Sequence, residues 1–217
     1  DTSKQGAVKW AYTIPNGTIR TDMTFSNQVL YFGTIDNVFG NAYLYALNTS
    51  TSPAPTLKWS DAFLVTNGVL HSFNHSPAVD GSGAYMIINV DASSPIDYLY
   101  GFSLTDGSEL WTPVELNNNT GSEVAISGST LYVAENGIEG VFKSNGRLSY
   151  QSVTGIVYGG VPGETITPIV VDGEVFVDGG DGFVEAYNTQ IGKYLGNIRW
   201  TSIGYSQGFS LPTNDSY

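Results

Sequence analysis

The sequence has no cysteine anywhere in its 217 residues. This absence excludes disulfides, thiolate metal sites, c-type haem attachment and cysteine nucleophiles. It does not place the protein in the cytosol, because a chain of this length can bury a substantial core and needs no disulfide to hold it.

Basic residues and long apolar runs are scarce as well. Lysine and arginine number 8 against 20 acidic residues, which gives a formal net charge of -12. A chain this acidic has no general electrostatic attraction for nucleic acid or for an anionic membrane. No apolar run approaches the roughly 18 residues of a membrane-spanning helix. We therefore expect no nucleic-acid partner and no membrane insertion.

No secretory leader is visible, because the chain is polar from Asp1 onward, which suits a mature chain or a part of a longer one. Glycine, serine, threonine, asparagine and tyrosine are abundant, and we take this composition to favour a secreted or cell-surface protein. Five Asn-x-Ser/Thr sequons are candidate N-glycosylation sites, of which the third is weakened by Pro77. They lie at Asn16, Asn48, Asn74, Asn118 and Asn214.

What the chain does have is a unit that repeats about every fifty residues and closes on a tryptophan. Its second copy contains two apolar strands, residues 84–90 and 98–104, followed by a closing segment at 105–111. The tryptophans that mark the units are Trp10, Trp59, Trp111 and Trp200, and Tyr150 stands where the third copy would have one.

The apolar residues fall in runs of a few residues, rich in Val, Ile, Tyr and Phe, and no stretch reads as a long helix. Asn-Gly and Asp-Gly pairs separate these runs and supply the positive φ that tight hairpins need. Such pairs include Asp80-Gly81, Asp106-Gly107, Asn145-Gly146 and Asp172-Gly173. Antiparallel meanders at this period are typical of propeller blades.

We therefore predict an all-β fold, a β-propeller of about four four-stranded antiparallel blades, in one domain that spans residues 1–217. The repeats fall at 7–59, 60–111, 112–150 and 151–200, with a partial unit at 201–217. We expect the five marker aromatics to dock each blade on its neighbour. Trp59, Trp111 and Trp200 should be largely buried, and replacing one with alanine should cost roughly 3–5 kcal/mol.

The repeat is similar to that of the pyrroloquinoline-quinone-like (PQQ-like) propeller superfamily. The matching residues are Ser76-Pro77-Ala78-Val79-Asp80-Gly81, Tyr43-Leu44-Tyr45-Ala46-Leu47 and Leu110-Trp111. The resemblance covers nearly the whole chain and implies the fold, but not an activity. The superfamily includes quinone-dependent alcohol dehydrogenases as well as cofactor-free scaffolds and binding modules, such as an outer-membrane assembly lipoprotein.

The number of blades leaves two arrangements open. Residues 7–14 and 197–204 read as the same element of the repeat, and a closed ring of four blades has room for only one of them. The chain is then either a four-bladed propeller with a spare strand or a part of a larger ring. Because unpaired edge strands readily bind other strands, we expect a protein partner or self-association through the terminal strands.

Several polar residues are candidates for a catalytic or metal-binding role, but their patterns do not favour one. His71 and His75, the only histidines, have no identifiable further ligands, and Asp178 with Asp181-Gly182 fits a turn better than a calcium loop. Nothing in the sequence brings two glutamates together as a catalytic pair. The glutamates considered were Glu115, Glu123, Glu135, Glu139 and Glu164.

For a quinone dehydrogenase, the resemblance to the superfamily implies a cofactor that lies between a stacking tryptophan and a vicinal disulfide, near a calcium ion. This chain has no cysteine and has tryptophans only at blade-docking positions. We therefore expect no catalytic residue, no cofactor and no metal. The alternating tyrosines, such as Tyr43, Tyr45, Tyr98 and Tyr100, could line blade interfaces or form a binding surface.

The sequence thus favours a secreted, non-enzymatic PQQ-like propeller that acts as a structural, assembly or protein-binding subunit. Two alternatives remain open. One is an enzyme, either a quinoprotein-type oxidoreductase or a polysaccharide-active enzyme. The other is a carbohydrate-binding module.

Overall fold

The computed structural model describes residues 8–15, 17–35, 42–63, 76–89, 96–116, 122–134, 138–151, 167–178, 183–190 and 194–199. For residues 62, 63, 89, 150, 151, 178, 183, 194 and 197–199 it describes the backbone only. Every regular element in these residues is a β-strand. No helix in the described ranges is long and apolar enough to cross a membrane.

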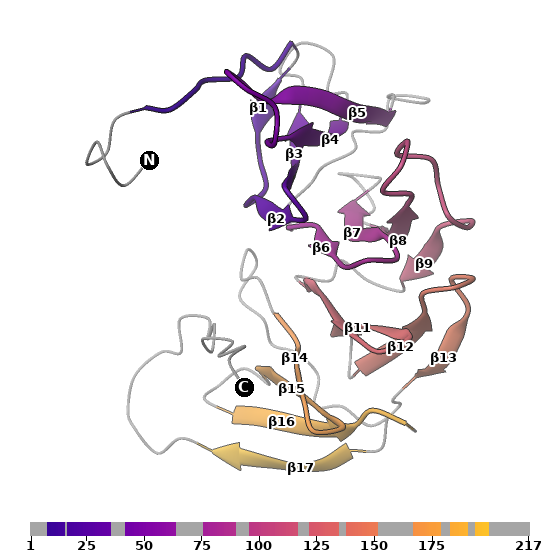
Figure 1. Cartoon of the computed structure of the whole chain (residues 1–217). Helices are drawn as coiled ribbons and strands as arrows, with labels where there is room; N and C mark the ends of the chain where they lie inside the picture. The colour runs from indigo at the N-terminus through magenta and orange to yellow at the C-terminus, as the bar shows by residue number, and fades with distance from the viewer. Residues whose placement is uncertain are drawn as a thin grey trace.

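The strands form four antiparallel sheets, which we call blades 1 to 4 in chain order (Figure 1). Blade 1 contains β1 (Thr18–Ile19), β2 (Thr24–Ser26), β3 (Val29–Ile35), β4 (Ala42–Asn48) and β5 (Thr56–Phe63). Blade 2 contains β6 (Ala78–Val79), β7 (Ala84–Asn89), β8 (Asp97–Phe102) and β9 (Val114–Leu116).

Blade 3 contains β10 (Val124–Ser127), β11 (Thr130–Ala134), β12 (Ile138–Phe142) and β13 (Leu148–Gln151). Blade 4 contains β14 (Ile169–Val171), β15 (Glu174–Asp178), β16 (Phe183–Asn188) and β17 (Tyr194–Arg199). Within each of these blades the strands pair in sequence order, so each sheet is a simple meander.

Blade 1 differs from the others in its first strand. Both β1 and β2 pair with β3, β1 opposite Ile35 and Thr34 at one end and β2 opposite Val29 to Tyr31 at the other. The two segments therefore occupy one edge of β3 and act together as a single interrupted first strand. Counted in this way, all four blades have four strands, as the repeat predicts.

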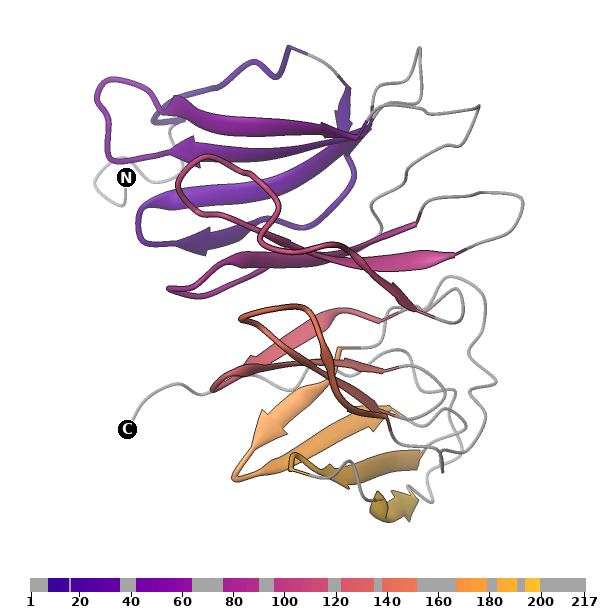
Figure 2. The same cartoon turned by 90° about the vertical axis from the view of Figure 1, so that its right-hand side faces the viewer.

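The blades follow one another along an arc, with blade 1 at one end and blade 4 at the other (Figure 1). In the perpendicular view their sheets lie one above another in chain order (Figure 2). The first strands of neighbouring blades contact each other, β2 with β6, β6 with β10 and β10 with β14. The first strands therefore line the inside of the arc, and the fourth strands lie toward its outside.

The core lies between blades rather than within one layer. Side chains alternate along each strand, so every blade presents one apolar face to the preceding blade and one to the following blade. Between blades 1 and 2, for example, Tyr31 and Leu44 pack with Met86, Tyr100 and Phe102. Separate clusters fill the junction between blades 2 and 3 and that between blades 3 and 4. This stacking confirms the predicted all-β blade architecture.

Candidate functional site

Trp59 connects blade 1 to blade 2. Its side chain is only 6% exposed, and its Nε1 donates a hydrogen bond to the carbonyl oxygen of Leu104 at 3.1 Å. The indole covers Gly107 in the turn after β8, where a Cβ atom would lie 2.7 Å from Cε3 of the ring. Gly107 also has a φ of +80°, which other residues rarely adopt. Glycine is thus required in this turn by both backbone and packing.

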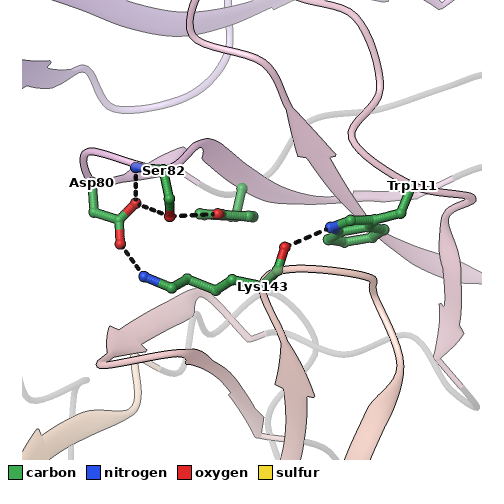
Figure 3. Close-up of polar contacts among 5 residues, drawn as sticks. Asp80, Ser82, Trp111 and Lys143 are labelled. Carbon is green, nitrogen blue, oxygen red and sulfur yellow. Dashed lines mark hydrogen bonds and ion pairs between the residues drawn. The ribbon is translucent and has the colours of Figure 1, made fainter.

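Trp111 repeats this contact between blades 2 and 3. Its Nε1 donates to the carbonyl oxygen of Lys143 at 3.0 Å (Figure 3). A Cβ atom at Gly146, in the turn after β12, would lie 2.6 Å from Cε3 of the indole. On the other side, a Cβ atom at Gly101 in β8 would lie 2.6 Å from Cζ2. The half-buried ring is thus held between a glycine of its own blade and a glycine of the next.

The same junction carries an ion pair. The Lys143 ammonium contacts Oδ2 of Asp80, in the hairpin between β6 and β7 (Figure 3). Oδ1 of Asp80 accepts hydrogen bonds from the backbone N–H of Ser82 at 2.8 Å and from its hydroxyl at 2.6 Å. Burial raises the pKa of Asp80, but the hydrogen bonds from Lys143 and Ser82 and the lysine charge outweigh burial and lower it.

The inner strands are joined by further hydrogen bonds that cross between blades. The hydroxyl of Thr24 in β2 donates to the carbonyl oxygen of Pro77 at 2.5 Å. The hydroxyl of Thr167, just before β14, donates to Oε2 of Glu123, just before β10, at 2.6 Å. Each bond therefore ties the first strand of one blade to that of the next.

The position taken by Trp59 in blade 1 is filled by other residues in blades 3 and 4. Trp59 lies opposite Ala46, Tyr150 lies opposite Gly140, and the corresponding partner of Ala186 in blade 4 is Gly196. Trp200 lies outside the described residues, four positions beyond Gly196. For Tyr150 the backbone alone is described. At the described positions, blade 4 therefore has a glycine where blades 1 and 3 have an aromatic residue.

Trp10 is half-buried at the other end of the arc, in a segment without secondary structure, residues 8–14. Two other residues of this segment, Tyr12 and Ile14, pack against the face of blade 1 that points away from blade 2. That face is buried and contains Phe32 and Tyr45, whose rings stack with centroids 5.5 Å apart. Burial, and then the neighbouring Tyr43 and Tyr12, raise the pKa of Tyr45.

The opposite end of the arc is less covered. In blade 3, the side chains that point toward blade 4 include Tyr132 and Ile138, which are buried. The corresponding face of blade 4, directed away from blade 3, contains Phe176, Val184 and Ala186, each partly exposed. An apolar blade face is thus left open among the described residues.

The tyrosines predicted as interface or surface residues lie in two apolar clusters, one on the outer face of blade 1 and one at the junction of blades 1 and 2. Tyr43 and Tyr45 both belong to the cluster on the outer face of blade 1. Tyr98 and Tyr100 both pack at the junction of blades 1 and 2. Burial, followed by the charges of Glu109, Tyr98 and Asp61, raises the pKa of Tyr100 to about 12.

The predicted glutamates are spread over several places. Glu115 is exposed on β9, Glu123 bonds Thr167, and Glu139 is 1% exposed on β12. Glu135 and Glu164 lie outside the described residues. The described part of the chain brings no three His, Cys, Asp or Glu residues together as a metal site.

The other polar candidates lie mostly outside the described residues. This applies to His71, His75 and Asp181-Gly182 and to the sequons at Asn16, Asn74, Asn118 and Asn214, and for Asp178 the backbone alone is described. Asn48 is described. It is half-buried at the end of β4, and its Oδ1 accepts a hydrogen bond from the hydroxyl of Ser50, the third sequon residue, at 2.7 Å.

Glu185 is a buried carboxylate that the sequence analysis missed. It lies on β16, is 0% exposed and belongs to the blade face directed at blade 3. Its Oε2 accepts a hydrogen bond from the Tyr187 hydroxyl at 2.6 Å, whereas Oε1 has no hydrogen-bond partner among the described residues. Strand register places Glu185 in the position that Glu139 has in blade 3 and Tyr45 in blade 1. An alignment of the four third strands could have revealed it.

The comparison with solved structures supports the fold. BamB from Moraxella catarrhalis is similar with a TM-score of 0.59 and 15% sequence identity, over 88% of this chain and 56% of that chain. A quinohemoprotein alcohol dehydrogenase from Pseudomonas putida HK5 is similar with a TM-score of 0.54 and 13% identity, over 82% of this chain and 34% of that chain. The chain thus spans about half or less of these two proteins.

A third similar structure is the computationally designed Ika4 protein, with a TM-score of 0.56 and 14% identity, over 85% of this chain and 99% of that chain. No protein-family model and no curated protein matches the sequence. BamB and the quinohemoprotein alcohol dehydrogenase are PQQ-like β-propeller proteins, and the chain shares their fold, which confirms the fold that the resemblance of the repeat implied.

Proposed function

We propose that this protein is a secreted or cell-surface, non-enzymatic propeller that binds other proteins through the ends of its blade arc. The observation that carries the proposal is the contrast between the blade faces at the junctions and the outer face of blade 4. Inner blade faces are filled by a neighbouring blade, whereas the outer face of blade 4 leaves Phe176 and Val184 partly exposed. Exposed apolar faces of this kind are typical of protein–protein contacts.

The described residues do not fit a quinone cofactor. The chain has no cysteine for a vicinal disulfide. Trp59 and Trp111 are both engaged between blades, so neither indole has a free face on which a ring could stack. Among the described residues, no three His, Cys, Asp or Glu side chains gather as they would around a metal ion. We therefore derive no catalytic step through such a cofactor. The superfamily's cofactor-free binding modules are the better match.

Native mass measurement and chemical cross-linking test the proposal. We expect the intact protein to form a concentration-dependent oligomer, or a complex with a defined partner, whose cross-links fall on blade 1 or blade 4. The proposal would be contradicted by a protein that stays monomeric at every concentration and cross-links to no partner in an extract of the cells that produce it. Dye-linked alcohol oxidation after incubation with the quinone and calcium would instead support an enzyme, and binding on a glycan array would support a carbohydrate-binding module.

A further inference from the structure

The segment before blade 1 has the sequence of an outer strand. Residues 8–10 read Val-Lys-Trp, and residues 57–59, in the fourth strand of blade 1, read Leu-Lys-Trp. In blade 1 that fourth strand pairs along its length with β4. Residues 8–14, in contrast, form no strand and make no backbone–backbone hydrogen bond within the described part of the chain. The segment thus has an outer-strand sequence without an outer strand's partner.

The segment also has the position of an outer strand. Trp59 belongs to the cluster that contains Tyr100, on the face of blade 2 that points toward blade 1. By strand register, Tyr45 is the residue of blade 1 that corresponds to Tyr100, and Tyr12 and Ile14 pack against the cluster that contains Tyr45. Residues 8–14 therefore lie against blade 1 as the outer strand of a preceding blade would.

The four third strands that the structure describes offer no free edge to this segment. An outer strand pairs with a third strand, and the third strands here are β4, β8, β12 and β16. Each of these already pairs with a strand on both sides. In particular, β16 is occupied by β17, so residues 8–14 cannot close a four-bladed ring by pairing with blade 4 unless β17 is displaced.

We propose that residues 8–14 bind an extended segment of a partner polypeptide as an added antiparallel β-strand. The inference rests on the proposed function and specifies its site. The backbone of residues 8–14, which makes no backbone–backbone hydrogen bond among the described residues, supplies the hydrogen bonds of strand addition, and Trp10 supplies side-chain selectivity. The packing of Tyr12 and Ile14 holds the segment in place beforehand, which lowers the entropic cost of binding.

The blades indicate the chemistry of the incoming strand. Trp59 lies opposite Ala46, Tyr150 lies opposite Gly140, and Trp111 covers Gly101 so closely that a Cβ atom there would be 2.6 Å from its ring. The partner strand should therefore carry glycine or alanine beneath Trp10. On either side of this residue, apolar and other side chains should alternate along the partner strand, so that the apolar ones point at blade 1. The third strands of the chain present apolar side chains to the next blade in the same way.

A peptide with the sequence of residues 97–104, Asp-Tyr-Leu-Tyr-Gly-Phe-Ser-Leu, is a suitable probe, because it is the third strand that pairs with the Trp111 segment. Fluorescence anisotropy with the labelled peptide and the full chain should give saturable binding, and amide hydrogen exchange should slow at residues 8–14. Trp10→Ala should weaken binding about tenfold or more. Lys9→Ala, at an exposed position, is the matched control and should leave it unchanged. Leucine in place of the peptide glycine should abolish binding.

The outcomes separate this inference from the function on which it rests. An absence of saturable binding, or binding that survives Trp10→Ala without protection at residues 8–14, would overturn strand addition. A native complex whose cross-links fall only on blade 4 and that is unaffected by Trp10→Ala would overturn it too, while leaving the proposed function intact. A dimer of the protein that disappears in Trp10→Ala would support strand addition with a second copy as the donor.

Discussion

The junction between blades 2 and 3 and the junction between blades 3 and 4 are formed by corresponding strands, but the side chains that fill them differ. The first holds Trp111 over Gly146 and adds the ion pair of Asp80 with Lys143. The second is an apolar cluster with the buried carboxyl group of Glu185, one oxygen of which has no hydrogen-bond partner in the described ranges. Strand pairing and alternation are alike at both, so they determine the fold, whereas the side chains determine how strongly each blade is held.

Among the substitutions that compare these junctions, adding a methyl group at Gly146 should have the largest effect. Gly146→Ala should lower the free energy of unfolding by about 2–4 kcal/mol. The φ of +68° at this position is strained for any residue other than glycine, and the Cβ atom would displace Trp111. Gly128→Ala is a matched control in the same blade, with a φ of +56° and nothing within 4 Å of the Cβ position. Gly128→Ala should lower the free energy of unfolding only by the cost of the backbone strain, about 1 kcal/mol. Equal losses in urea denaturation would show that the indole contact contributes little.

The junction of blades 3 and 4 should respond in the opposite direction when Glu185 is replaced by glutamine. Glu185→Gln should raise the free energy of unfolding by about 1 kcal/mol, because among the described residues one oxygen of this buried carboxyl group has no hydrogen-bond partner. Glu139, at the corresponding position of blade 3, takes part in a polar interaction, so Glu139→Gln should bring no gain. Urea denaturation of both variants measures the difference. A loss of stability in Glu185→Gln would mean that the carboxylate is fully satisfied.

The ion pair should make the junction of blades 2 and 3 sensitive to acid. Lys143→Met should lower the free energy of unfolding by about 1 kcal/mol at pH 7. Because the folded pKa of Asp80 is lowered, its contribution is present above the unfolded pKa and is lost as pH falls through the folded one. The difference in the free energy of unfolding between Lys143→Met and the parent protein should therefore become smaller at acid pH. Lys58→Met, at an exposed lysine of β5, is the control for loss of a positive charge.

The smallest effect should be at the junction of blades 1 and 2. Burial and the nearby Asp61 raise the pKa of the Glu109 carboxyl. A group with a raised folded pKa stabilises the fold when protonated, and that contribution is lost as pH rises through the folded pKa. Glu109→Gln should therefore unfold at a slightly higher temperature than the parent at pH 7, with no difference below about pH 4. A lower midpoint at pH 7 would show that the charge is well solvated or paired.

Much of the fold could be predicted because the repeat encodes it locally. Asp-Gly and Asn-Gly pairs fix the hairpins, and alternating apolar residues fix which faces meet. The position of the docking residue in blade 4 could not be predicted from the tryptophans alone. The register places Gly196 opposite Ala186, although Trp200 is the more conspicuous residue. The burial of Glu139 and Glu185 was missed for a similar reason, because a charged residue in isolation is expected to be exposed.

In the contact of Trp111 with Gly146, as in that of Trp59 with Gly107, the indole comes from the earlier blade and the glycine from the later one. Each of the two contacts of this kind joins a residue near the end of one repeat to a turn near the end of the next. A gene duplication that copied one whole repeat would therefore copy both halves of the interface together. Chains of this type can lengthen or shorten by whole blades over evolutionary time without the need for a new contact surface to arise by mutation.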